Sequence, residues 1–262
     1  MNVEELIIET FKKAVHMIEE NKEYTSLSGK PKIIYPCYSQ KLGSGKTRIS
    51  EQEIKQLFIQ TLIEDKKNDF YFSVETPTEY RYVFKNKPKV VKSKEGIPNE
   101  NPVSARFDLC LYRYQQNEFT REYLIEFKAK NKAKNQGAEE EKAKEIKKDF
   151  LKLFAEGKNQ NQYFIHVIDS YDEGTEKSIN EKYTVSMEYC KKYFEEQQKD
   201  INIYLLILNN KFDNKPDSDS KPHYFKIHRH GTKWKIININ DNSFSFEDYE
   251  PLKDQNIRDS DS

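Results

Sequence analysis

Two carboxylates and a lysine stand in two neighbouring stretches with strand-like patterns. The stretch ARFDLCLY carries Asp108, and the stretch YLIEFKAK carries Glu126 and Lys128. Side chains of a β-strand alternate between its two faces, so Glu126 and Lys128 share a face and Asp108 points away from its apolar neighbours. If the two strands pair, Asp108 and Glu126 meet across the ladder with Lys128 beside them.

These residue types suit metal-assisted hydrolysis. Two close carboxylates repel each other unless a cation lies between them. Mg²⁺ prefers oxygen ligands of this kind, with Mn²⁺ as a substitute, and the backbone carbonyl of Phe127 adds another oxygen nearby. Lys128 is placed to orient a metal-bound water and to offset negative charge that develops on a phosphate. The pattern therefore indicates a site for a phosphodiester.

The elements that must position these residues follow from periodicity and punctuation. Residues 4–20 and 138–156 have helical apolar stripes, and a third helix starts at Ser50, where Ser50 and Glu53 form a capping box. A further helix is expected over about 178–198. Strands are expected at 32–38, 70–76, 80–84, 104–113, 121–129, 163–168 and 201–208, with a hairpin of 223–229 and 233–239. Pro77 should end the strand at 70–76, residues 85–102 read as a basic loop, and residues 246–262 read as a disordered acidic tail.

Asp108 followed by Glu126-Phe127-Lys128 resembles the signature of the PD-(D/E)XK, or restriction-endonuclease-like, nucleases. The resemblance covers about residues 48–170, in which a helix, three strands, a helix and a strand follow in the family's order; Phe107 stands where the family often has proline. It implies one α/β domain over residues 1–245, with a central mixed β-sheet flanked by helices. The N-terminal helix and the C-terminal hairpin are then elaborations. The resemblance also implies a Mg²⁺-dependent DNA endonuclease of restriction, defence or repair, with Asp108, Glu126 and Lys128 as site residues.

Further site residues are predicted around this signature. The family often has an acid on its first core helix; Glu51 lies on the same side as Ile54 and Phe58, whereas Glu53 is used by the capping box. Glu75, at the end of a strand, is a second candidate for the metal. Candidate nucleic-acid contacts are basic residues near these elements: Lys130, Lys132, Lys134, Arg106, Lys46 and Arg48.

Composition limits the partners. The 262 residues have a formal net charge of +0, so attraction to nucleic acid must come from local basic patches. Three widely spaced cysteines argue against a disulfide framework and favour a reducing compartment. The first residues lack the pattern of a signal peptide, and no apolar run approaches a membrane span. We expect a cytoplasmic protein without a membrane partner, and a homodimer is left open.

Other interpretations remain open. Asp108, Glu126 and Lys128 could be salt-bridged residues on a solvated sheet face, or the fold could serve as an inactive binding scaffold. The stretch KLGSGKT resembles a P-loop, but the first glycine of that motif falls on Gln40 and the capping signal comes only at Ser50. The histidines 223, 228 and 230 are better explained by a surface hairpin than by a metal site.

Overall fold

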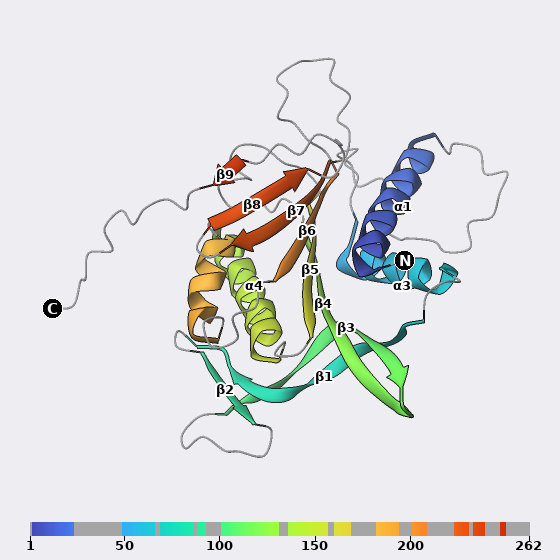
Figure 1. The fold of residues 1–262 in the computed structure, drawn as a ribbon. Helices are drawn as coiled ribbons and strands as arrows, with labels where there is room; N and C mark the ends of the chain where they lie inside the picture. The colour runs from blue at the N-terminus through green and yellow to red at the C-terminus, as the bar shows by residue number, and fades with distance from the viewer. Residues whose placement is uncertain are drawn as a thin grey trace.

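A computed structural model gives the mixed α/β architecture expected from the sequence, with helices on both faces of one sheet (Figure 1). It describes residues 2–23, 49–65, 69–85, 88–92, 101–130, 136–156, 160–168, 182–193, 201–208, 223–230, 233–238 and 247–249. The helices are α1 (Val3–Glu23), α3 (Glu51–Glu64), α4 (Gln136–Glu156) and a helix over 182–193. Within this part of the chain, no helix has the length and apolar character needed to cross a membrane.

The described strands form one open sheet in the order β2-β1-β3-β4-β5-β6-β7-β8-β9. Pairing is antiparallel from β2 to β4, parallel from β4 through β5 to β6, and antiparallel from β6 to β9. The strands are β1 (Tyr71–Val83), β2 (Lys89–Lys92), β3 (Val103–Gln115), β4 (Glu118–Lys130), β5 (Asn161–Ile168), β6 (Asn202–Ile207), β7 (His223–His230), β8 (Lys233–Asn238) and β9 (Glu247–Tyr249). Gln116 and Asn117, both with positive φ (52° and 66°), join β3 to β4 in the tight reversal that a two-residue hairpin requires.

Two hydrophobic cores lie on the two faces of the sheet. The first core packs α1 and α3 against the central strands and includes Phe11, Phe58, Leu109, Ile125 and Phe127. The second core packs α4 and the helix over 182–193 against the opposite face and includes Phe107, Leu124, Phe150, Phe164 and Tyr183. Residues of β4 therefore alternate between the cores, as period-two patterning predicts, with Leu124 in the second and Ile125 in the first.

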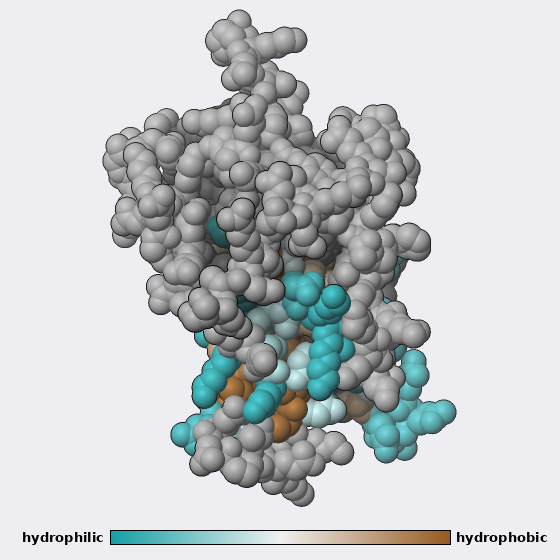
Figure 2. All heavy atoms as spheres, turned by 90° about the vertical axis from the view of Figure 1, so that its left-hand side faces the viewer, coloured by the Kyte–Doolittle hydropathy of each residue, from teal (hydrophilic) through white to brown (hydrophobic). Residues whose placement is uncertain are grey.

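The second core extends to the β1–β2 side of the molecule. Figure 2 looks onto that side and shows a limited hydrophobic area framed by hydrophilic side chains of the described residues. Phe84 and Val90 are partly buried there and pack against the second core. This polar frame agrees with the low mean hydropathy of −0.97.

The start of α3 is fixed by its capping box. Ser50 Oγ accepts a hydrogen bond from Glu53 N at 3.2 Å, and Glu53 Oε2 accepts one from Ser50 N at 2.7 Å. The helix thus begins at Glu51, after the KLGSGKT stretch, whose residues 41–47 lie outside the described part. A P-loop would need the helix to begin at its Lys-Thr. The capping box therefore sets the position of Glu51, the first residue of the helix, as predicted.

Three strand predictions were wrong in detail. β1 does not stop at Pro77 but continues to Val83. The register between β1 and β3 shifts between Pro77 and Arg81, which accommodates the proline. At this point Thr78 Oγ1 forms hydrogen bonds with the backbone of Ala105 in place of a regular ladder. β2 forms inside the predicted basic loop because Lys89–Lys92 pair with β1. β9 takes three residues of the predicted tail into the sheet beside β8. The predicted strand at 32–38 lies outside the described residues.

Phe107 does not lie on the face of β3 that alternation predicts. Strict alternation along β3 would place Phe107 on the same face as Leu109 and Leu111, yet Phe107 belongs to the second core and those leucines to the first. The described ladder between β3 and β4 ends at the Leu109–Ile125 pair, so the pleat is not held regular beyond it. This irregular point in the sheet lies next to Asp108.

Candidate active site

Asp108 lies where β3 and β4 stop pairing. Its Oδ2 accepts a hydrogen bond from the backbone N–H of Phe127 at 2.9 Å. The N–H groups of a central strand alternate between its two neighbours, so the Phe127 amide faces β3 and would otherwise lack a ladder partner. The carboxylate thus replaces a backbone acceptor and is fixed against β4, the strand that carries Glu126 and Lys128.

A lysine of α3 joins Asp108 to Glu75. Lys55 Nζ lies 2.8 Å from Glu75 Oε1 and 3.3 Å from Asp108 Oδ1, and the Lys55 side chain is only 6% exposed. Val74 pairs with Leu109 and Thr76 with Phe107, so Glu75 stands opposite Asp108. Burial alone would lower the pKa of Lys55, but its hydrogen bond to Glu75 and the charge of Asp108 outweigh burial and raise it.

Glu75 itself has a strained backbone. Its φ of 50° lies in the left-handed region, which a residue with a β-carbon occupies at a cost of about 1–2 kcal/mol. Strain of this kind persists only where the surrounding contacts fix it, and it gathers at functional sites. Here the Lys55 ion pair and the β1–β3 ladder on both sides of Glu75 supply those contacts.

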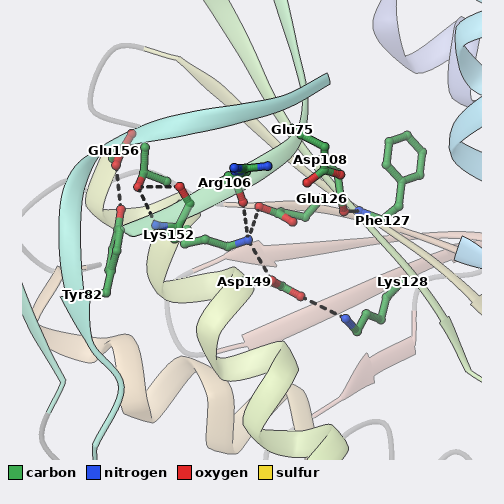
Figure 3. Close-up of polar contacts among 12 residues, drawn as sticks. Glu75, Tyr82, Arg106, Asp108, Glu126, Phe127, Lys128, Asp149, Lys152 and Glu156 are labelled. Carbon is green, nitrogen blue, oxygen red and sulfur yellow. Dashed lines mark hydrogen bonds and ion pairs between the residues drawn. The ribbon is translucent and has the colours of Figure 1, made fainter. Parts of the chain in front are cut away.

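Glu126 is buried against α4. It is 2% exposed, and its Oε1 forms an ion pair with Lys152 Nζ at 2.6 Å. Lys152 Nζ also lies 3.0 Å from Asp149 Oδ1 and donates to the carbonyl oxygen of Arg106 at 2.9 Å. Figure 3 shows Lys152 reaching from α4 to these three groups, with Asp108 on the far side of Glu126.

Lys128 lies between two helices. Its Nζ is 3.5 Å from Glu51 Oε2, on the first turn of α3, and 3.6 Å from Asp149 Oδ2, on α4. The Lys128 side chain is 20% exposed, so it is only partly removed from solvent. Two carboxylates from separate elements therefore orient the lysine of the predicted signature.

The site has an excess of negative charge. Its five carboxylates surround three ammonium groups, so two negative charges remain if all of these groups are ionised; the carboxylates are Glu51, Glu75, Asp108, Glu126 and Asp149, and the ammonium groups are Lys55, Lys128 and Lys152. This formal balance equals the charge of one divalent cation.

Two of the carboxylates have raised pKa values, chiefly because they are buried. Burial raises the pKa of Glu126 well above its usual value, against the charge of Lys152, which lowers it. Burial also raises the pKa of Glu51, against the opposing charge of Lys128. The charges of Asp108 and Asp149 raise both pKa values further. Additional positive charge at this place would stabilise the ionised forms.

The structure brings together the core of the predicted site. Asp108, Glu126, Lys128, Glu51 and Glu75 lie in one connected group of ion pairs and short-range charge interactions. Phe127, predicted to offer its carbonyl, contacts the group through its amide. The remaining predicted residues contribute no described side-chain contact: Arg106 is exposed and supplies its carbonyl oxygen, while Lys46, Arg48, Lys132, Lys134 and the side chain of Lys130 lie outside the described part.

Three members of the group were not predicted: Lys55, Asp149 and Lys152. All three residues are buried. A signal was present in α4, where Asp149 and Lys152 interrupt an apolar stripe that includes Ile146, Phe150 and Leu153. Charged residues in the buried stripe of a helix need partners. The sequence could not show that β3 and β4 provide them.

The two cysteines that the structure describes, Cys110 and Cys190, take no part in this group. Cys110 belongs to the second core, and burial raises the pKa of its thiol to about 11, which leaves little thiolate at neutral pH. Cys190 is also free and buried. The structure therefore favours carboxylate and lysine chemistry over a thiol nucleophile.

Among the residues that the structure describes, no set of three or more His, Cys, Asp and Glu side chains is arranged as a metal site. A Mg²⁺ site differs from such a set, because this ion is usually bound by one or two carboxylates and keeps several waters. Comparisons of the chain with protein-family models, curated proteins and solved structures give no match.

Proposed function

We propose that this chain is a Mg²⁺-dependent nuclease with a restriction-endonuclease-like core, acting on DNA phosphodiesters. One arrangement carries the proposal. Asp108 and Glu126 lie on the adjacent strands β3 and β4, and Lys128, two residues after Glu126, forms an ion pair with Glu51. A resemblance in sequence order alone requires neither the Glu51–Lys128 contact nor the Asp108–Phe127 contact. Restriction, defence and repair are the roles that such an activity would serve.

The donor set fits a hard divalent ion. Asp108 and Glu126 would supply carboxylate oxygens and Phe127 its carbonyl, with Glu75 as a further acid beside Asp108; Mn²⁺ could replace Mg²⁺. The excess of carboxylates over ammonium groups in the site gives a further reason for a cation there. When bound, such an ion supplies Lewis-acid stabilisation of the phosphate and lowers the pKa of water.

The chain's own residues then have separate tasks. Lys128 brings a positive charge to a partly exposed position, where it stabilises negative charge that develops on the phosphate in the transition state. Glu51 and Asp149 hold this ammonium group from two sides and limit its freedom. The Phe127 amide fixes one oxygen of Asp108, which preorganises that carboxylate before substrate arrives.

The test is cleavage of plasmid and linear DNA by purified protein with Mg²⁺. We expect Asp108→Ala and Lys128→Ala each to lower the cleavage rate by about 10²-fold or more, in the range of losses for groups that act in the transition state. Asp69→Ala and Lys191→Ala are matched controls, because these side chains are 72% and 58% exposed outside the site. Equal rates for wild type and both site variants would refute the proposal.

One observation favours an inactive scaffold of the same fold instead. Asp108 and Glu126 already have lysine partners, Lys55 and Lys152, and could be purely structural ion pairs. Calorimetric titration with Mg²⁺ and Mn²⁺ separates the two functions. Binding of either ion that is lost in Asp108→Ala supports the nuclease, whereas no binding by the wild type supports the scaffold.

A further inference from the structure

Lys152 occupies a position that an inorganic cation could take. Three oxygens surround its Nζ: Glu126 Oε1 at 2.6 Å, the Arg106 carbonyl at 2.9 Å and Asp149 Oδ1 at 3.0 Å. Two carboxylates and a backbone carbonyl are also the ligand types of Mg²⁺ and Ca²⁺ sites. An ammonium group has three donors, and here each of them has an acceptor oxygen within reach.

The ammonium group is held in place rather than merely attracted. The Lys152 side chain is 9% exposed, and its Nζ lies 5.9 Å from the centre of the Phe107 ring. One turn further along α4, Glu156 accepts hydrogen bonds from Tyr80 N at 2.9 Å and from Tyr82 Oη at 2.8 Å. α4 is thereby fastened to β1, which holds the helix backbone that carries Lys152 next to the site (Figure 3).

Because Lys152 contacts Glu126, its ammonium group affects where a metal ion can bind. One of its oxygens is committed to Lys152, and Asp108 lies on its other side. A second divalent ion between Glu126 and Asp149 would need the space and the charge that Lys152 already supplies. With Lys152 present, the five carboxylates and three ammonium groups of the site have a formal charge that one divalent ion balances, and a second ion would exceed it.

We propose that the Lys152 ammonium group is a built-in cation that takes the place of a second metal ion and holds Glu126 for the first. This inference rests on the proposed metal-dependent function. Lys152 is a positioning residue, since it acts through Glu126. The chain should bind one divalent ion, and removal of the ammonium group should open a second site formed by Glu126, Asp149 and the Arg106 carbonyl.

The test counts bound Mn²⁺ per chain at saturation by electron paramagnetic resonance. We expect one ion for the wild type and two for Lys152→Met, with line broadening because the two ions are close. Lys148→Met, an exposed lysine one turn earlier on α4, should retain one ion. The double variant Asp149→Asn/Lys152→Met preserves the charge balance and replaces a carboxylate ligand with a neutral amide, so it should also bind one ion.

A second readout covers loss of stability. Lys152→Met leaves the buried Glu126 without its lysine partner and leaves Asp149 with Lys128 alone, at 3.6 Å. This loss should destabilise the folded protein, so Mn²⁺ should raise the melting temperature of the variant more than that of the wild type. If Lys152→Met does not fold, Lys152→Gln keeps a donor toward Glu126 without a charge and should bind two ions.

The outcomes separate the two proposals. Two results would overturn the proposed role of Lys152 without contradicting the proposed nuclease function. One is two bound ions in the wild type; the other is one bound ion in every folded Lys152 variant with no added stabilisation by Mn²⁺. No ion in the wild type would overturn both.

Discussion

At the scale of single residues, the site consists of two runs of alternating charges, which meet at the carboxylates of Asp108 and Glu126. Lys55, Lys152 and Lys128 each connect two acids, and together they link α3, β1, β3, β4 and α4. A buried carboxylate that loses its lysine is left uncompensated, so single substitutions in these runs affect stability as well as chemistry. Variants that keep shape and change one charge are therefore the most informative.

Glu51→Gln should change how stability depends on pH. Burial raises the pKa of Glu51 in the folded protein, so between the usual pKa of 4.5 and the raised value the folded state binds more protons than the unfolded state. The free energy of unfolding contributed by Glu51 therefore falls as the pH rises through this window. Glutamine cannot ionise, so the variant should lose less stability from about pH 4.5 to neutrality.

Urea unfolding at several pH values measures this difference. Glu126 and Glu156, whose pKa values are also raised by burial, are present in both proteins and cancel in the comparison. Parallel stability curves for wild type and Glu51→Gln would contradict the expected environment of Glu51.

At the scale of elements, positions depend on a few buried polar contacts. α4 is tied to β1 by Glu156, whose side chain is fully buried and also lies 3.6 Å from Arg121. Because α4 carries Asp149 and Lys152, this attachment sets the distance from α4 to the site.

Tyr82→Phe tests that attachment. Removing the hydroxyl takes a hydrogen bond of 2.8 Å from a buried carboxylate, and we expect a loss of about 1.5–3 kcal/mol in the free energy of unfolding. Tyr114→Phe is the control, because Tyr114 is 48% exposed and should change stability little. Equal stability of the two variants, measured by urea unfolding, would show that the Glu156 contact does not hold α4.

Ser50→Ala tests the capping box of α3. The substitution removes the side-chain acceptor for Glu53 N and should cost about 1 kcal/mol. The first turn of α3 carries Glu51, so fraying there should also loosen the Glu51–Lys128 pair. Helix content by circular dichroism and the urea midpoint should both decrease; an unchanged midpoint would exclude a stabilising cap.

The sequence could predict those parts of the site that depend on local patterns. Alternation identified β3 and β4, and the capping box located Glu51 on α3, because both signals lie within a few residues of each other. Lys55, Asp149 and Lys152 could not be assigned, since their partners on other elements lie 20 or more residues away and only packing brings them together. β2 escaped prediction for the same reason: its four residues become a strand only by pairing with β1.

At the scale of the whole molecule, a formal net charge of +0 means that binding to DNA depends on how charge is distributed. In the sequence, the candidate basic run Lys130, Lys132 and Lys134 follows directly after Lys128. The activity, the metal, the DNA partner and the cytoplasmic location stay predictions.

Replacing those three lysines with glutamine should weaken DNA binding and its salt dependence. Each lost phosphate contact reduces the slope of log affinity against log salt concentration by about 0.9, so the slope should fall by about 2.7. Fluorescence anisotropy with the Asp108→Ala variant, which should not cleave the probe, measures this slope. Lys191→Gln/Lys192→Gln on the helix over 182–193 is the control. An equal fall in the slope per lysine in this control would contradict a specific role of the basic run in DNA binding.

The bond from the Phe127 amide to Asp108 gives the protein an internal reporter. A backbone proton in the middle of a sheet is held there by one side chain, so its exchange with solvent and its NMR frequency follow the state of that carboxylate. Addition of Mg²⁺ should shift this single resonance first, and Asp108→Ala should speed its exchange while neighbouring amides of β4 stay protected. Events at the carboxylate can thus be followed without substrate and without cleavage.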